Sequence, residues 1–525
     1  MRAILCFDEK GPEWLDDLFA VASASWPVGL ANLSTYAFPL ADLVVVGHML
    51  GPTALAAACL CLVVVNLALE PAIFIMHNAV TSLCAYAIAS QNTSQLHWHI
   101  RAAVLFCALL ALPLVGLVLA TPVLLIGPFA LHVDVASGLR SFAPAYSLSI
   151  APALLLAALQ GFLRAHGQHR STALLCWMAL VPNVGLALHL VPQYGLRGSA
   201  YTMAATRVAC VLVLGLRHCD ALRRPASARG GGLRAPLLYL AKDFAHSWVP
   251  VSLRVGIAQL IALIAVVPAV SGLEGSLGAS QAASAFALTS LLLQAAASVC
   301  MGVQQATIML VTRHVSLGRV VQAQHTMRLA GLLLLGLCVT FGVPCYAFRD
   351  HLGALFIGSG SEAHESLPTD GKGGSGGSGE SGRADLVHGL STLAAYLGPM
   401  LVLKTSAGLY GLFFAVTGRG AIGTWILLLA HGCFGLPAAY CWAAERRGGA
   451  EPLMQAHALA WLLAALAFAA AYLWLPTTEP QGASQLSDAE MGRTGSSRGS
   501  SRGSSTCATP LARPLLGQDG QPSAA

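Results

Sequence analysis

Charged residues are scarce in this sequence. Only 10% of its 525 residues are Asp, Glu, Lys or Arg, whereas 56% are hydrophobic, and the mean hydropathy is +0.68. A soluble domain carries about 25% charged residues. The composition therefore excludes one large water-soluble core and indicates a multi-pass integral membrane protein, with the lipid bilayer as its first partner.

Several chemical motifs are also missing. The fourteen cysteines include no CxxC pair, and most lie in apolar runs, which is typical of buried small side chains. No HExxH or paired-acid metal motif occurs, and the stretch TDGKGG lacks the spacing of an ATP-binding loop. No basic block with interleaved aromatics suggests nucleic acid. We expect no enzyme activity, no cofactor and no nucleic-acid partner.

Long apolar runs are abundant instead. A spanning helix needs about 20 predominantly apolar residues, and the sequence predicts an all-α protein with twelve such segments. They lie at 25–47, 53–76, 102–122, 139–162, 171–191, 197–216, 246–270, 280–303, 326–348, 386–414, 420–443 and 453–475. Pro182 and Pro192 interrupt the fifth segment.

The segments predict two six-helix bundles with polar connections. The bundles cover 25–217 and 246–475; the connections are a cytosolic N-terminal segment (1–24), a basic cytosolic linker (218–245), a flexible Gly/Ser-rich loop (359–383) and a disordered cytosolic tail (476–525). With a cytosolic N-terminus, thirteen Arg and Lys residues, including Arg164, fall in inner loops and seven in outer loops. The positive-inside rule then predicts that both termini are cytosolic.

The two halves resemble each other in sequence. The fourth segment ends in LQGFLRAHGQHR (159–170) and the tenth in LYGLFFAVTGRG (409–420), each with Gly and Arg after an aromatic helix end. Six is an even number, so the repeat is parallel. Two such bundles facing each other predict a cavity between them, where transporters hold substrates.

Four motifs stand out in the first half of the chain: DLVVVGHMLGPTALAAA (42–58), TSLCAYAIASQ (81–91), QGFLRAHGQHRSTAL (160–174) and PNVGLALHLVPQYGLRGSAYT (182–202). Together they resemble motifs of the multidrug and toxin extrusion (MATE) family of secondary transporters. The resemblance covers about residues 25–475. It implies twelve helices in two lobes forming a V, and export of drugs, xenobiotics or organic anions in exchange for protons or sodium.

An Asp in the first helix, as at Asp42, is similar to the DinF-type branch of the family. The common branch has a proton-binding glutamate in helix seven, where this chain has Ala258 and Gln259. By the resemblance, Asp42 is the ion-coupling acid of helix one, and Asn183, a further ion-coupling candidate, matches the family's helix-five Asn. The family's second acid of that network is replaced by Ala187. Sodium prefers several oxygen ligands, so this loss favours protons.

Other polar residues inside the spans are candidates because a charge at the bilayer centre costs about 2.5–3.5 kcal/mol. Asn32 and Glu70 are candidates for ion coupling beside Asp42. Arg207, Arg254, Lys404 and Gln259 are candidates for substrate binding. Arg207 is also a possible ion-pair partner of Asp42. Arg254 and Lys404, with no acid in the spans of their own half, favour an anionic substrate.

Two other functions fit the same sequence. A lipid or oligosaccharide flippase of the related superfamily would use a cationic cavity, and the antiporter could be coupled to sodium. The motifs favour a proton-coupled antiporter that works as a monomer on a small organic substrate.

Overall fold

The structure is a computed structural model, and the parts of it described below are nearly all helical. It describes residues 13–89, 93–129, 131, 133–217, 237–238, 240–241, 277–316, 320–356, 378–416, 420–445 and 450–474. The seventh predicted span (246–270), most of the basic linker, most of the Gly/Ser-rich loop and the tail (476–525) lie outside these residues.

Seven helices form the first half of the chain. They are α1 (Glu13–Leu50), α2 (Pro52–Ala89), α3 (Thr93–Phe129), α4 (Val133–Ser147), α5 (Ile150–Ala165), α6 (His169–Tyr194) and α7 (Leu196–Arg217). Gly51, at φ +83°, takes the left-handed conformation that ends α1, and Pro52 opens α2. α6 continues through Pro182 and Pro192, so the fifth predicted segment is one helix despite its two prolines.

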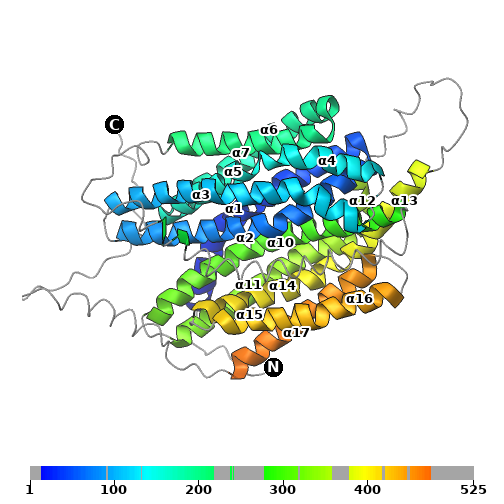
Figure 1. Cartoon of the computed structure of the whole chain (residues 1–525). Helices are drawn as coiled ribbons and strands as arrows, with labels where there is room; N and C mark the ends of the chain where they lie inside the picture. Colours follow the sequence, from blue (N-terminus) through cyan, green and yellow to red (C-terminus); the bar gives the residue numbers. More distant parts are fainter. Residues whose placement is uncertain are drawn as a thin grey trace, which may run out of the picture. The chain divides into compact units, whose positions relative to one another are not determined.

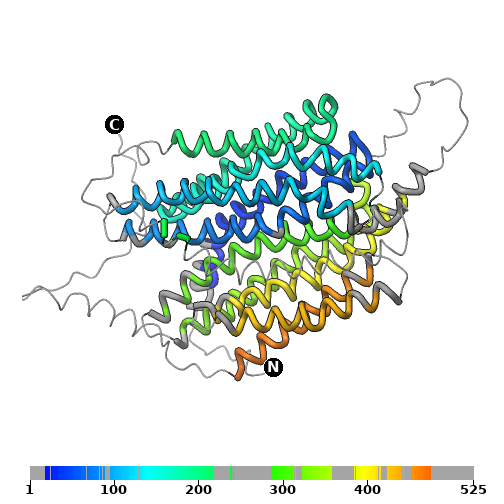
Figure 2. The backbone as a smooth tube through the Cα atoms, viewed as in Figure 1, coloured from blue at the N-terminus to red at the C-terminus, as the bar shows by residue number. Residues whose placement is uncertain are grey.

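The second half contains the helices from α10 onward. They are α10 (Leu277–Ser316), α11 (Val320–Ala347), α12 (Arg349–Phe356), α13 (Ser378–Ala394), α14 (Leu397–Val416), α15 (Gly420–Leu428), the π-helix η3 (Leu429–Gly435), α16 (Leu436–Glu445) and α17 (Ala450–Trp474). α13 begins inside the predicted flexible loop, whose last residues are therefore helical. Figures 1 and 2 show α1–α7 in blue to green and α10–α17 in green to orange.

Many of these helices are suited to cross a bilayer. In the described part of the chain, nine helices are long and apolar enough to span, or eleven if each of two bent helix pairs counts as one span. Exposed apolar side chains such as Leu112 on α3 and Val339 on α11 fit contact with lipid tails. The spans overlap the predicted segments closely except in α2, where the spanning stretch is Ala68–Ala85 and the predicted segment was 53–76.

The two bent pairs lie at corresponding places in the two halves. α4 and α5 meet at 45°, and α13 and α14 meet at 50°. These pairs are the fourth and tenth predicted spans, the same two whose ends share sequence. The parallel repeat predicted from sequence therefore has a matching structural feature.

The halves meet chiefly where α1 packs against α10. A Cβ atom on Gly302 would lie 2.4 Å from the Gly29 backbone nitrogen and 2.8 Å from the Ser25 carbonyl oxygen. Two helix backbones can approach this closely only with glycine at the crossing. The contact lies in the first part of α1.

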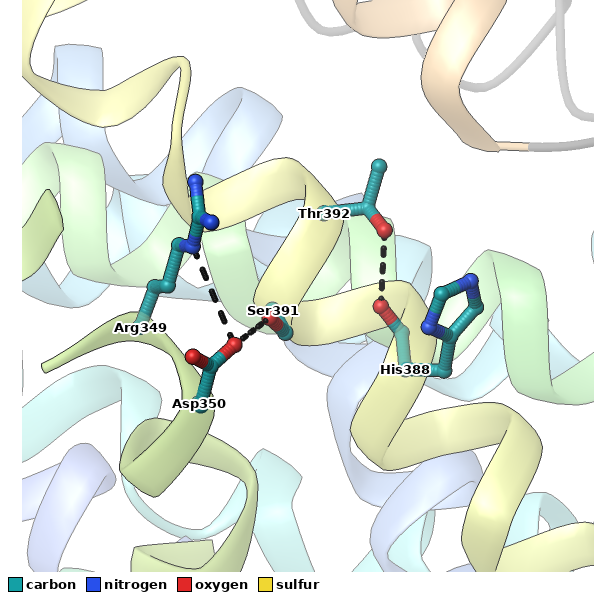
Figure 3. Close-up of polar contacts among 5 residues, drawn as sticks. All are labelled: Arg349, Asp350, His388, Ser391 and Thr392. Carbon is teal, nitrogen blue, oxygen red and sulfur yellow. Dashed lines mark hydrogen bonds and ion pairs between the residues drawn. The ribbon is translucent and has the colours of Figure 1, made fainter.

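The short helix α12 packs against α1 near its other end. A Cβ atom on Gly47 would collide with the Phe356 carbonyl oxygen at the end of α12. Figure 3 shows how α12 is held against α13: the Ser391 hydroxyl donates to Asp350 at 2.5 Å, and Arg349 pairs with the same carboxylate at 3.8 Å. α12 is thus fixed to the second half while it touches the first.

Candidate functional site

Asp42 lies in a polar cluster inside the first half. Its side chain is fully buried, and the Asn183 amide of α6 donates to Asp42 Oδ1 at 2.8 Å. The Thr206 hydroxyl of α7 donates to the Asn183 carbonyl oxygen at 2.7 Å, which fixes the orientation of that amide. Asp42 Oδ2 is buried and has no hydrogen-bond partner. Oδ1 therefore accepts a hydrogen bond, whereas Oδ2 accepts none.

Arg207 lies beside this cluster without closing an ion pair on it. The guanidinium interacts electrostatically with Asp42, but it donates to the Ser149 hydroxyl at 2.9 Å and lies 5.8 Å from the centre of the Tyr146 ring. No ion pair joins Asp42 to Arg207 in the described structure, so the predicted pairing is wrong. Ala187 is buried with Val45 and Val191, which leaves an apolar contact where the family has an acid.

A cavity of about 230 Å³ lies between the two halves. α1, α2 and α5 line one side of it, and α10, α14, α15 and α17 line the other. Pockets for drug-sized ligands are about 300–1,000 Å³, so this volume suits a smaller solute. Arg207 and Asp42 are not among the residues that line it.

Opposite charges face this cavity from opposite halves. Glu70 lies on α2 and Lys404 on α14, and the two interact electrostatically. The Tyr36 hydroxyl of α1 is within hydrogen-bonding reach of Glu70. The second half was expected to present its cations with no acid in its own spans, but Lys404 is opposed by an acid from the first half.

The remaining lining is rich in amides and aromatic rings. Glutamine comes from α5 and α10, and Tyr36, Phe74 and Trp461 supply rings. The residues that make this lining polar are Gln160, Gln294, Gln304, Gln305, His77 and His457. Such a surface can hydrogen-bond the polar groups of an organic molecule and cover its apolar face.

Arg164 bridges the halves at one end of the cavity. It is only 7% exposed, and it donates to Gln305 Oε1 of α10 at 2.7 Å and to Asn32 Oδ1 of α1 at 3.3 Å. Arg164 lies in the last turn of α5 and is buried, so its assignment to a loop is wrong. Asn32 was a candidate for ion coupling with Asp42. In the structure it belongs to this bridge and does not contact the Asp42 cluster.

The candidate residues thus separate into several places. Asp42 and Asn183 are together; Glu70 and Lys404 share the cavity; Asn32 belongs to the bridge; Arg207 is buried in the first half. Arg254 and Gln259 lie outside the described residues. Sequence reasoning missed the cavity glutamines and His457, although polar residues inside apolar spans are the general signal of such sites.

Comparison with known proteins places this geometry in context. The MatE family model matches residues 27–189, which includes the whole Asp42 cluster except Thr206. The sequence matches none of the curated proteins with which it was compared.

Solved MATE structures share the fold over nearly the whole chain. The eukaryotic MATE transporter AtDTX14 is 16% identical with a TM-score of 0.66, covering 90% of this chain and 100% of its own. A mutant of the Vibrio cholerae MATE transporter VcmN is 18% identical with a TM-score of 0.64, covering 91% of this chain and 98% of its own.

A third solved structure is a MOP superfamily transporter from Pyrococcus furiosus, reported with a binding pocket of reverse polarity. It is 16% identical with a TM-score of 0.65, covering 87% of this chain and 95% of its own. The resemblance to the MATE family is confirmed by the MatE family model and by the fold.

Proposed function

From the premise that this chain has the MATE fold and resembles that family, we propose that it is a secondary transporter that exports small organic solutes in exchange for protons. Asp42 carries the proton. The cavity between the halves carries the solute, with Lys404 contacting a negatively charged group on it.

The Asp42 carboxyl group is the observation that carries this proposal. Charge on a fully buried carboxylate with one unpartnered oxygen is costly, and a proton on Oδ2 removes that charge. The Asn183 amide still donates to Oδ1 in either state. Ala187, buried against Val45 and Val191, stands where the family has a second acid, so fewer hard oxygen ligands are offered, which favours protons over sodium.

Helix α1 connects the proton site to the cavity. Asp42 faces Asn183 of α6, whereas Asn32 and Tyr36 of the same helix line the cavity against the other half. Pro39 lies between Tyr36 and Asp42, where it removes a backbone hydrogen bond and makes the helix easier to bend. Protonation of Asp42 changes how α1 packs, and this in turn changes the cavity wall.

Alternating access requires the contacts at both ends of the cavity to separate in turn. The Gly29–Gly302 crossing and the Arg164 bridge hold the halves together at one end, and the Gly47–Phe356 contact lies towards the other end of α1. When the halves rock against each other, the contacts at one end would break while those at the other end remain. The solute then leaves on the opposite side from which it entered.

Lys404 gives the cavity a cation that the substrate can meet. The Pyrococcus fold relative is reported with a pocket of reverse polarity, so pocket charge differs among proteins of this fold. An organic anion pairs with Lys404, while its polar groups reach the glutamines of α10.

The test uses purified protein in liposomes with an acidic lumen. We expect wild type to accumulate radiolabelled 4-aminohippurate or tetraethylammonium above the external concentration, and Asp42→Asn only to equilibrate it. Asp134→Asn, at an exposed acid of the same half, is the matched control and should behave as wild type. Full accumulation by Asp42→Asn, or accumulation driven only by a sodium gradient, would refute the proposed coupling.

A further inference from the structure

The buried His431 and the half-buried His457 form a cluster in the second half that the proposed mechanism does not use. His431 lies in the π-helix η3 and His457 on α17, with ring centres 6.0 Å apart. The Trp461 ring lies 4.6 Å from His431, edge to face. His457 and Trp461 also line the cavity. π-Helical turns occur frequently at functional sites because they present side chains that a regular helix would not.

Hydrogen bonds fix which nitrogen of each ring carries a hydrogen. His431 Nδ1 contacts the Leu427 carbonyl oxygen at 3.2 Å, and a carbonyl only accepts, so His431 Nδ1 carries the hydrogen. The Trp461 indole only donates, and it donates to His457 Nε2 at 3.2 Å, so that nitrogen is bare and His457 Nδ1 carries the hydrogen.

These tautomers leave one acceptor and one donor without a partner. His431 Nε2 holds a free lone pair, and His457 Nδ1–H has nothing to donate to; both atoms are buried. Buried polar atoms are nearly always hydrogen-bonded, so each exception calls for an explanation. His431 contacts His457 and Trp461, which line the cavity, so its lone pair lies one side chain from the cavity and is a place where a proton can bind.

We propose that His431, supported by His457, forms a second proton-binding site in this protein, additional to Asp42. The proton adds to the lone pair of His431 Nε2 and leaves from the same atom, with no other bond made or broken. The enclosed pair is neutral because a charge away from water is costly. The proton binds when the cavity opens to water.

The charged groups around the pair define what protonation does. Lys404 on α14 acts electrostatically on both rings, and Glu70 of α2 lies across the cavity from Lys404. Glu451 of α17 accepts hydrogen bonds from Tyr396 and Gln455. Protonated His431 therefore adds positive charge beside Lys404, which strengthens the attraction of the cavity for an anion. This consequence rests on the proposed function, whereas proton binding itself does not.

Tryptophan fluorescence tests proton binding without any transport measurement. A protonated imidazole quenches a nearby indole, and Trp461 contacts both rings. The signal of Trp461 is obtained by subtracting the Trp461→Phe protein, because other tryptophans also report. Enclosure disfavours the charged ring, so we expect the Trp461 signal of wild-type protein in nanodiscs to fall only when the pH is taken to the acidic end of the usual histidine range of about pH 8 to pH 5, or below it.

Substitutions identify the residue responsible. The same subtraction in a His431→Gln background should lose the acid-dependent quenching, and His457→Gln should shift its midpoint. His388→Gln, at an exposed histidine of α13, is the matched control and should leave it unchanged. Unchanged quenching in folded His431→Gln protein, judged by size-exclusion profile, would overturn the proposal. Asp42→Asn should keep the quenching, so failure of the antiport mechanism would not be mistaken for failure here.

Discussion

At the scale of single residues, the proposed proton site at Asp42 and the proposed solute contact at Lys404 are in separate places. Asp42 lies within one half, hydrogen-bonded to Asn183, and has no direct access to the cavity. Lys404 lies at the cavity wall. A proton at Asp42 can therefore act on the solute only through the helices between them.

Lys404 is expected to set the preference for anions. Loss of a charge-assisted hydrogen bond costs about 1.5–3 kcal/mol, so Lys404→Ala should raise the KM for 4-aminohippurate by about 10- to 100-fold. Uptake of tetraethylammonium should not weaken. Initial rates of radiolabel uptake in proteoliposomes measure both.

The controls for this prediction separate charge from structure. Lys404→Arg keeps the cation and should retain most of the affinity, and Arg170→Ala removes an exposed cation without effect. An unchanged KM for the anion in Lys404→Ala would show that Lys404 does not contact the substrate.

Some of these residues could be found from sequence and others could not. Asp42 and Asn183 were predicted because they match the helix-one acid and the helix-five Asn of the family that the chain resembles, and they do contact each other. Arg164 was placed in a loop because a cation at a helix end is usually solvated; its burial depends on acceptors from α1 and α10 that are distant in sequence. The histidine pair has no sequence motif, because two helices meet to form it.

At the scale of helices, the contact between α1 and α10 is the main joint between the halves. Its closeness depends on Gly29 and Gly302, which are separated by most of the first half of the chain. The sequence predicted both helices, but periodicity cannot show which glycines of two distant helices face each other.

Gly302→Ala tests this joint. The added Cβ would lie 2.4 Å from the Gly29 nitrogen, so the helices must move apart, at a cost of about 1–3 kcal/mol typical of overpacking. We expect a lower Tm in detergent, measured by thermal unfolding. Gly336→Ala on α11 meets no atom within 4 Å and is the matched control, with an equal or higher Tm. Equal Tm values for wild type and Gly302→Ala would contradict the close crossing.

At the scale of the whole chain, the repeat predicted from sequence is visible in the two bent helix pairs, α4–α5 and α13–α14. The cavity between the halves was also expected from the repeat. Its mixed charge was not, because the acid on α2 and the cation on α14 meet only after the halves assemble. Sequence reasoning treated each half alone and so gave the second half an unopposed cation.

Proton movement caused by the substrate tests the antiport claim most directly. Proteoliposomes carry a pH-sensitive dye in the lumen, and 4-aminohippurate is added outside with no starting pH gradient. The account predicts that substrate entry drives protons out, so the lumen becomes alkaline with wild type, and that Asp42→Asn and protein-free liposomes give no such change. Substrate entry with no change of lumenal pH, or with acidification, would contradict proton antiport through Asp42.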